Sequence, residues 1–299
     1  MEMNLPFKIP KKYEPKIREL KYSLKLLRKN SLSFAGAMII FIFVIIAILA
    51  PIIAPYPEHA GRRTAIKERF QPPSQDHLLG TDSYGRDILS RLIYGARISL
   101  FAGTLAIGLA LLIGVPLGAI AGAVGGYVDE AIMRVVDVFL SFPPLLLALV
   151  IAATLGPSLN NAILAIAITW WPWYTRIIRG DAQSVKERPF VEAAKAIGEG
   201  KLKIAFRHVL PNSITGVIVQ SSMDFGSVVL TLASLSFLGL GAQPPTPEWG
   251  LMISSERVYF LTNPWVVVFP GLAILIMVFA FNVFGDGLRD VIDPRTRRR

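Results

Sequence analysis

Long runs of uncharged, mostly apolar residues recur along the chain and are separated by shorter segments rich in charge. The first run, from Ser31 to Tyr56, has its apolar core at Phe34–Ile53, and the second covers Ile98–Val124. Each is long enough to cross a hydrocarbon core of about 30 Å as a helix that rises about 1.5 Å per residue. The pattern therefore predicts an all-α protein that is embedded in a membrane.

The same pattern predicts six transmembrane helices. The uncharged stretch from Val138 to Thr175 is too long for one crossing, and the turn-forming segment Gly156–Asn161 divides it into spans three and four. Ile214–Gly239 and Trp265–Phe284 give spans five and six. The predicted organisation is an N-terminal segment (1–30), the first span (31–56), an outer loop (57–97), a core of five spans (98–295) that includes an inner loop (176–212), and a basic tail (296–299).

The composition agrees with a membrane protein, because 53% of the residues are hydrophobic and only 17% are charged. Of the 31 Lys and Arg residues, 23 fall on the side of the two termini and the inner loop, and 8 fall on the other side. Cytoplasmic loops are enriched in these residues, so both termini and the inner loop are predicted to be cytoplasmic. Topology thus accounts for the net charge of +10 without a nucleic-acid partner.

The N-terminal segment has an amphipathic pattern, with Ile17, Leu20, Leu24 and Leu27 on one helical face beside basic residues. This pattern predicts a helix that lies on the cytoplasmic surface of the lipid bilayer. An arm that binds nucleic acid or a partner protein is the alternative, although the sequence has no RNA- or DNA-binding signature.

Span two has small residues at a spacing of four, namely Gly114, Gly118 and Gly122. In lipid, such a face marks the close approach of another helix, so we predict helix packing there. A functional hinge at Pro116 is the alternative.

Span five has a polar face made of Gln220, Asp224, Ser227, Thr231 and Ser234. An acid at membrane depth is energetically costly, so Asp224 should point into a bundle, a partner or a water-filled passage. The face predicts either a translocation pathway or a polar contact between subunits.

The sequence offers no catalytic or metal site. It contains no cysteine, its three histidines are scattered over different loops, and no HExxH or GxSxG motif occurs. The segment Gly200-Lys201-Leu202 fails as a phosphate-binding loop because Leu202 occupies the hydroxyl position. If ATP drives this protein, another chain must bind it.

The inner loop is predicted to contain a short docking helix. Pro189 suits a first turn, and Gly198 and Gly200 suit an end. The small apolar face that lies between them consists of Phe190, Ala193, Ala194 and Ile197. Small side chains allow a groove of a partner to close over the helix. A helix that lies on lipid is the alternative.

The inner loop resembles the EAA loop of permease subunits in binding-protein-dependent ABC importers. The matching residues are Glu192-Ala193-Ala194, Gly198 and Leu210-Pro211, whereas His208 occupies a position that is usually apolar. Three further blocks resemble C-type permeases of dipeptide and oligopeptide importers: His77–Asp82 with Gly85-Arg86-Asp87, Ser90-Arg91 and Gly95–Leu100; Leu235–Gly241 with Gln243–Gly250; and Phe281-Asn282 with Gly285–Asp290 and Asp293-Pro294-Arg295.

This resemblance implies a type I ABC importer permease fold in the cytoplasmic membrane of a prokaryote. It also implies a B-type permease as partner, two cytoplasmic ATPases that bind ATP and Mg²⁺, and an external substrate-binding protein, with no cofactor on this chain. The helix Phe190–Gly198 would dock in an ATPase groove and move spans four and five. The cargo would be dipeptides or oligopeptides, with nickel chelates or oligosaccharides as alternatives.

Two rival classes of function remain at this stage. An ion-coupled secondary transporter would use Asp224 as its proton or cation site, but no second acid lies deep in a span. A membrane-bound enzyme would need its histidines brought together.

The outer-loop motifs have competing interpretations. Asp82, Arg86, Asp87 and Arg91 predict either a contact for the binding protein or an ordinary helical salt bridge between Asp87 and Arg91 at i, i+4. Trp249 follows a proline-rich turn and suits either a gate contact or an interfacial anchor.

Overall fold

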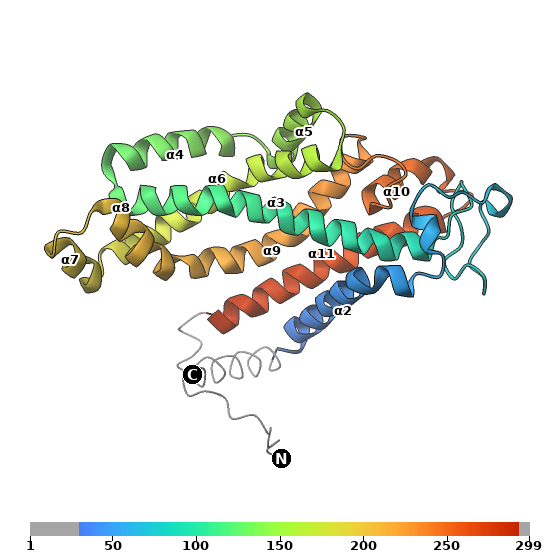
Figure 1. The fold of residues 1–299 in the computed structure, drawn as a ribbon, viewed down its shortest axis with the longest axis horizontal. Helices are drawn as coiled ribbons and strands as arrows, with labels where there is room; N and C mark the ends of the chain where they lie inside the picture. Colours follow the sequence, from blue (N-terminus) through green and yellow to red (C-terminus); the bar gives the residue numbers. More distant parts are fainter. Residues whose placement is uncertain (1–29, 293–299) are drawn as a thin grey trace, which may run out of the picture.

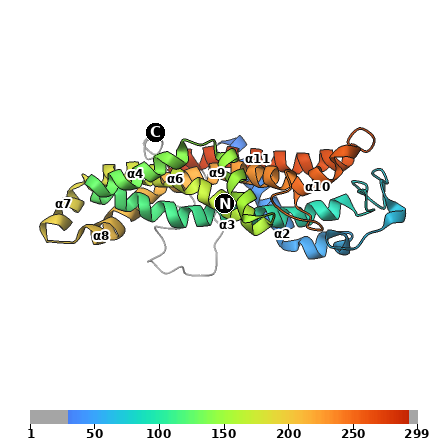
Figure 2. The ribbon, with the colours of Figure 1, turned by 90° about the horizontal axis from the view of Figure 1, so that it is seen from above.

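The computed structural model describes residues 30–292, and all its named elements are helices, which confirms the all-α prediction for that range. Five long helices run roughly along the long axis of the molecule: α2 (Ser31–Ile53), α3 (Ile88–Val124), α6 (Leu159–Lys186), α9 (Leu210–Phe237) and α11 (Trp265–Ile292), as Figure 1 shows. Seen from above, they form a thin layer (Figure 2). The amphipathic segment 17–28, the block Asp293-Pro294-Arg295 and the tail 296–299 lie outside the described residues.

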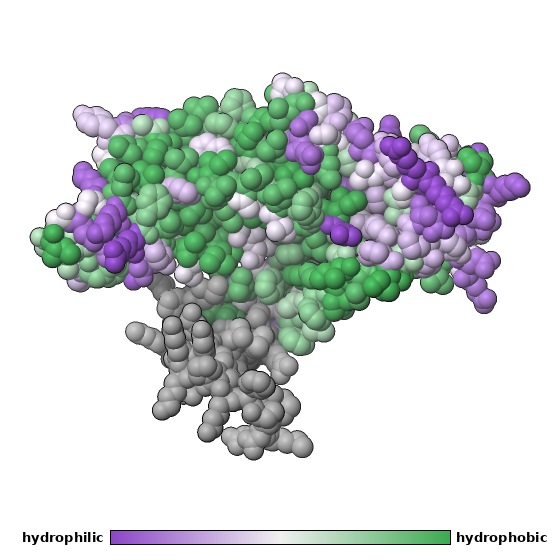
Figure 3. Space-filling view, in the orientation of Figure 1, coloured by the Kyte–Doolittle hydropathy of each residue, from purple (hydrophilic) through white to green (hydrophobic). Residues whose placement is uncertain are grey.

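The surface is divided into a middle band and two polar ends. The middle of the molecule is predominantly apolar, whereas hydrophilic residues gather at both ends of the long axis (Figure 3). Large apolar side chains such as Phe41, Ile48 and Leu112 are exposed in this band. Because lipid solvates such side chains, the long helices can cross a membrane with the two ends in water.

The predicted third span is not a straight helix. In the structure, α4 (Gly126–Leu140) and α5 (Pro144–Leu155) meet at a bend of 89°. The bend contains Pro143 and Pro144. Proline lacks the N–H that a helix needs, and it disfavours helical backbone in the residue before it, so two in succession end α4. The prediction missed this break because the uncharged stretch was judged by hydropathy alone.

The structure does not confirm the predicted number of six spans. Within residues 30–292, four helices are long and apolar enough to cross a membrane, or five if the bent pair counts as one span. Helix α6, which was expected as span four, has 28 residues but is not among these helices because it is less apolar. It continues past Thr175 into the predicted inner loop through Arg176, Arg179 and Asp181. Buried between α3 and α9, it can tolerate polar residues that lipid would not.

Two helices begin earlier than the sequence predicted. Helix α3 begins at Ile88 rather than Ile98, because the carboxylate of Asp87 accepts the Ser90 N–H at 2.7 Å and caps the first turn. The helix of span five begins before Ile214, since helix α8 (Lys201–Ile204) and the π-helical segment η4 (Ala205–Val209) lead directly into α9. The wider π turn accommodates a proline that lacks its own N–H.

The glycine face of α3 lies directly against α6. A Cβ atom added to Gly114 would lie 2.5 Å from the carbonyl oxygen of Trp171, and one added to Gly118 would lie 2.5 Å from that of Thr175. At Gly122 the obstacle is the Cβ of Ala182, also at 2.5 Å. These distances leave no room for a side chain, so the helix backbones touch. Helix α3 continues through Pro116, and the hinge at that residue stays a prediction.

Candidate functional site

The inner loop forms one end of the molecule. Helix α7 (Pro189–Ala196) follows α6 and lies at the far left of Figure 1, beyond the ends of α3 and α9. Its inward face consists of Val191 and Ala194, which is only 5% exposed. They pack in an apolar cluster with Ala123, Ala182, Val185, Ile204, Ala205 and Val209. The expectation that Ala194 faces the cytosol is wrong, because the spacing of three residues places it beside Val191 on the buried face.

The outward face of α7 is open. Phe190 is 41% exposed and Ile197 is 79% exposed, and the side chains of Glu192 and Ala193 are exposed between them. An eight-residue helix with one buried edge and two large apolar residues in solvent is suited to a partner's groove.

The end of α7 depends on backbone geometry. Gly198 has a φ of +83°. The N–H of Glu199 donates to the carbonyl of Ala194 at 3.1 Å, and the N–H of Gly198 donates to that of Lys195 at 3.0 Å. This is a Schellman motif, in which glycine adopts the left-handed conformation without strain. Open space surrounds Gly198, so the backbone, and not crowding, requires a glycine.

His208 has a definite role in the inner loop. Its Nε2 lies 2.7 Å from a carboxylate oxygen of Glu199, whose other oxygen lies 2.8 Å from Nζ of Lys203. These hydrogen bonds, from Lys203 first and then His208, hold the pKa of Glu199 below its usual range. The residue after the α7 cap is thereby tied to the π segment. Leu210, half-buried, and Pro211, exposed, then begin α9.

The polar residues of α9 occupy different environments. The amide of Gln220 donates to Oδ1 of Asp224 at 2.9 Å. The Tyr174 hydroxyl of α6 faces this carboxylate, but it and Oδ2 of Asp224 are buried without a partner in hydrogen-bond geometry. Thr231 is buried and Ser234 half-buried, and each donates to a carbonyl of its own helix, whereas Ser227 is exposed. The structure therefore brings only Gln220 and Asp224 together.

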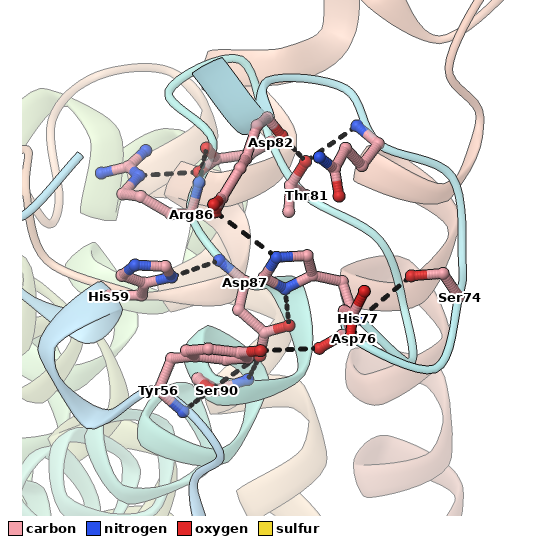
Figure 4. A network of polar contacts seen from close by, with 12 residues as sticks. Tyr56, His59, Ser74, Asp76, His77, Thr81, Asp82, Arg86, Asp87 and Ser90 are labelled. Carbon is pink, nitrogen blue, oxygen red and sulfur yellow. Dashed lines mark hydrogen bonds and ion pairs between the residues drawn. The ribbon is translucent and has the colours of Figure 1, made fainter. Parts of the chain in front are cut away.

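The outer loop contains a dense polar network (Figure 4). One carboxylate oxygen of Asp82 accepts the Nε–H of Arg86 at 2.7 Å, and the other accepts the backbone N–H of the same residue at 2.9 Å. Asp87 caps α3 and lies 3.0 Å from Nδ1 of His77. The predicted pair between Asp87 and Arg91 is wrong, because Arg91 approaches Asp82, at 3.6 Å, instead.

Two of the three scattered histidines meet in this network. The backbone N–H of Asp87 donates to Nδ1 of His59 at 3.0 Å. Tyr56 stacks on His59 at 5.2 Å between ring centroids and lies 4.9 Å from His77 (Figure 4). Burial lowers the pKa of His59, although Glu58 and Asp87 oppose this effect. Non-periodic segments of the outer loop bring these residues together, so the contact between the two histidines and Asp87 could not be predicted from sequence periodicity.

These residues do not form a metal centre. Within residues 30–292, no group of three or more His, Cys, Asp or Glu side chains is arranged to hold a metal ion. Asp82, Asp87, Arg86 and the two histidines are instead hydrogen-bonded within the network, whereas Nε of Arg91 has no hydrogen-bond partner.

Trp249 is buried inside the protein, so it is not an anchor at the membrane interface, whereas a gate contact stays a prediction. It is 1% exposed, its Nε1–H donates to the carbonyl of Leu92 at 3.2 Å, and its indole fills the space above Gly95. It begins helix α10 (Trp249–Glu256), which the buried carboxylate of Glu248 caps. The interfacial anchor was expected because Trp249 follows a proline-rich turn in the sequence, which gave no sign of its burial.

Comparison with known proteins identifies two matching family models. Residues 114–298 match the model of the binding-protein-dependent transport system inner membrane component. Residues 20–73 match the N-terminal transmembrane domain of oligopeptide transport permease C.

Curated relatives are similar over most of the chain. The dipeptide transport system permease protein DppC of Alkalihalophilus pseudofirmus is 46% identical over 92% of this chain and 90% of its own length. The protein of the same name from Haemophilus influenzae is 44% identical over 91% of this chain and 93% of its own. The glutathione transport system permease protein GsiD of Pectobacterium atrosepticum is 41% identical over 90% of this chain and 89% of its own.

A solved structure has a similar fold. A chain from inward-facing conformations of the MetNI methionine ABC transporter superposes with a TM-score of 0.52, over 67% of this chain and 95% of that chain. Its sequence is 18% identical. This likeness extends to the fold alone.

Proposed function

This chain belongs to the family of binding-protein-dependent transport system inner membrane components, as a C-type permease subunit of an ABC importer, and we propose that its cargo is dipeptides or short oligopeptides. The chain is not itself an enzyme, because separate ATPase subunits hydrolyse the ATP. Its relatives named for dipeptide and glutathione transport favour a peptide cargo over nickel chelates or oligosaccharides.

The exposed face of α7 is the observation that supports a mechanical role. Family membership implies ATPase, binding-protein and second-permease partners. In our proposal, two ATPases bind ATP and Mg²⁺, and one of them receives Phe190 and Ile197 in a groove. Movement of α7 would reach α6 through Val191 and Ala194, and would reach α9 through the link between Glu199 and His208.

The charge distribution supports one orientation of the chain in the membrane. We propose that both termini and the inner loop face the cytoplasm of a prokaryotic cell and that the outer loop faces the external binding protein. A B-type permease would complete the pathway, with Gln220 and Asp224 beside it. Since Asp224 already has an amide partner and faces Tyr174, Asp224→Asn should leave the complex assembled while slowing uptake. Loss of the complex in detergent would instead identify a contact between subunits.

Reconstitution tests the proposed function. The chain is placed in liposomes with its second permease and ATPases, and its binding protein is added outside. We expect uptake of a labelled dipeptide that requires both ATP hydrolysis and the binding protein. Uptake by this chain alone, driven by a proton gradient, would contradict the mechanism, and a binding protein that carries only nickel chelates or oligosaccharides would contradict the cargo.

A further inference from the structure

A pocket of about 310 Å³ opens at the outer end of the molecule. It lies between the outer loop, the segment Pro244-Pro245 and α10. Three arginines, Arg62, Arg86 and Arg91, line it together with Thr64, Tyr84 and Ser255. The pocket is distinct from α7 and from the polar face of α9, and it includes Arg86 and Arg91, for which the sequence left a contact with the binding protein open.

The cations of this pocket exceed the anions that neutralise them. The carboxylate of Asp82 already accepts the Nε–H of Arg86 at 2.7 Å, and Arg91 reaches the same oxygen only at 3.6 Å. Two guanidinium groups therefore share one carboxylate. Glu256, which accepts the Ser83 hydroxyl at 2.7 Å, is the second acid beside these two arginines, and Arg62 is the additional cation. No acidic side chain in the described part of the chain forms an ion pair with Arg62.

Arg91 is the least satisfied of the three arginines. It is 3% exposed, and its Nε is buried without a hydrogen-bond partner. Its Nη1 reaches only the carbonyls of His59, at 3.3 Å, and Pro245, at 3.5 Å. A buried guanidinium nitrogen without a hydrogen-bond partner is costly, and an anion that enters the pocket would relieve that cost.

We propose that this pocket binds a carboxylate that arrives from outside the membrane. Planar guanidinium groups match the two oxygens of a carboxylate, and desolvated charge-assisted hydrogen bonds are strong. The volume is near the lower end of the range for small-ligand pockets, so it suits the terminal residue of a peptide or one acidic side chain. The carboxylate is that of the transported peptide or that of the external binding protein. The choice between these two sources rests on the proposed function.

Arginine labelling tests the pocket directly. The intact complex is treated with phenylglyoxal, and modification of Arg62 is followed by mass spectrometry in the presence of N-acetylalanine or its amide. Arg63 is the internal control, because it is exposed, pairs with Glu58 at 3.0 Å and does not line the pocket. We expect N-acetylalanine, and not the amide, to slow labelling of Arg62 alone. Equal effects of the two compounds, or no effect of either, would overturn the proposal.

Matched variants then identify the source of the carboxylate. If the peptide supplies it, Arg62→Gln should raise KM roughly tenfold for a free dipeptide and leave KM for the amidated peptide unchanged. If the binding protein supplies it, Arg62→Gln should weaken binding of the peptide-free binding protein to the complex and affect both peptides equally. Arg63→Gln should do neither.

A second variant guards against misfolding and against confusion with the proposed function. Arg91→Lys keeps the buried charge but loses the guanidinium plane, and we expect it to reproduce the Arg62→Gln effects. The proposal that this pocket binds a carboxylate would be refuted if the Arg62→Gln, Arg91→Lys and Arg63→Gln variants behaved identically in labelling, KM and binding. Absence of dipeptide uptake in the unaltered complex would refute the proposed cargo while leaving the labelling result in force.

Discussion

The outer and inner loops are held in opposite ways. In the outer loop, buried polar groups bond to one another around Asp82 and Asp87, and His59 and His77 are part of that network. In the inner loop, one small apolar cluster under Val191 and one half-buried ion-pair group at Glu199 fix α7. The outer loop is thus a preorganised surface, whereas the inner loop has few internal ties and leaves its large apolar side chains for a partner.

This difference predicts different kinds of sensitivity. A buried polar group that loses its partner costs about 1–3 kcal/mol, so changes in the outer loop should act on stability. An exposed side chain costs little to remove, so changes on the outward face of α7 should act on coupling and leave stability intact.

The largest effect is expected at Asp87. Asp87→Ala removes the cap of α3 and the partner of His77, so we expect a loss of about 3 kcal/mol of stability. Thermal unfolding of the purified complex in detergent measures this loss. Asp76→Ala is the control, because the side chain of Asp76 is exposed and Tyr56 uses only its backbone carbonyl. Equal unfolding temperatures for the two variants would contradict the conclusion that the buried polar network stabilises the outer loop.

The next largest effects are expected on the two faces of α7, where a buried substitution and an exposed one should differ in their effect on stability. Val191→Ala empties a fully buried site and should cost about 2 kcal/mol. Ile197→Ala should change stability by less than about 0.5 kcal/mol, yet lower the ATPase activity that transport stimulates. Parallel unfolding and ATPase assays distinguish these outcomes. If Ile197→Ala kept full coupling, the outward face would not be the docking surface.

Gly198 should give a smaller loss that acts on coupling. Gly198→Ala forces a side chain into a left-handed backbone and should cost about 1–2 kcal/mol at the end of α7. Gly200→Ala is the matched control, since the φ of Gly200 is −67° and its surroundings are also open. Uptake per ATP hydrolysed should fall in the first variant only. Equal coupling in both would show that the Schellman cap does not matter.

The smallest effect is expected from pH. Because the pKa of His59 is lower in the folded protein than the usual 6.5, the unfolded state binds the proton more readily. Stability is therefore complete above pH 6.5 and declines as the pH falls from there toward the folded pKa. Protonation removes the acceptor for the Asp87 N–H, so hydrogen exchange should accelerate in the outer loop and not in α7.

His59→Asn is the control for this pH effect. Its side-chain oxygen can accept the same N–H without titrating. The outer loop of this variant should exchange at a rate that does not increase on acidification. An acid response as large as that of the unaltered protein would assign the effect to another group.

The sequence was most informative where one local rule determines the structure. The apolar length of α2, the glycine spacing of α3 and the glycine after α7 each have a short-range cause, and the described structure has the corresponding features. Recognition of the family also came from contiguous motifs. The EAA block kept its spacing even though His208 replaced an apolar residue.

The predictions that failed depended on three-dimensional neighbours. The hydropathy of residues 138–155 gave no sign that Pro143 and Pro144 would bend the chain by 89°. The partners of Asp87 and Arg91 were chosen by helical spacing, but irregular segments brought His77 and Asp82 closer. Trp249 looked exposed because Gly95, which makes room for it, lies far away in sequence.

The π segment Ala205–Val209 determines the direction in which the side chains of α9 point around the helix axis. One residue more in a turn shifts the angular position of later side chains by about 100° relative to an uninterrupted α-helix. Asp224 meets Tyr174 only at the observed phase. Deleting a single residue from this segment would turn the carboxylate about a quarter-turn away from α6, so the inner-loop end of α9 decides which side chains α9 presents to α6.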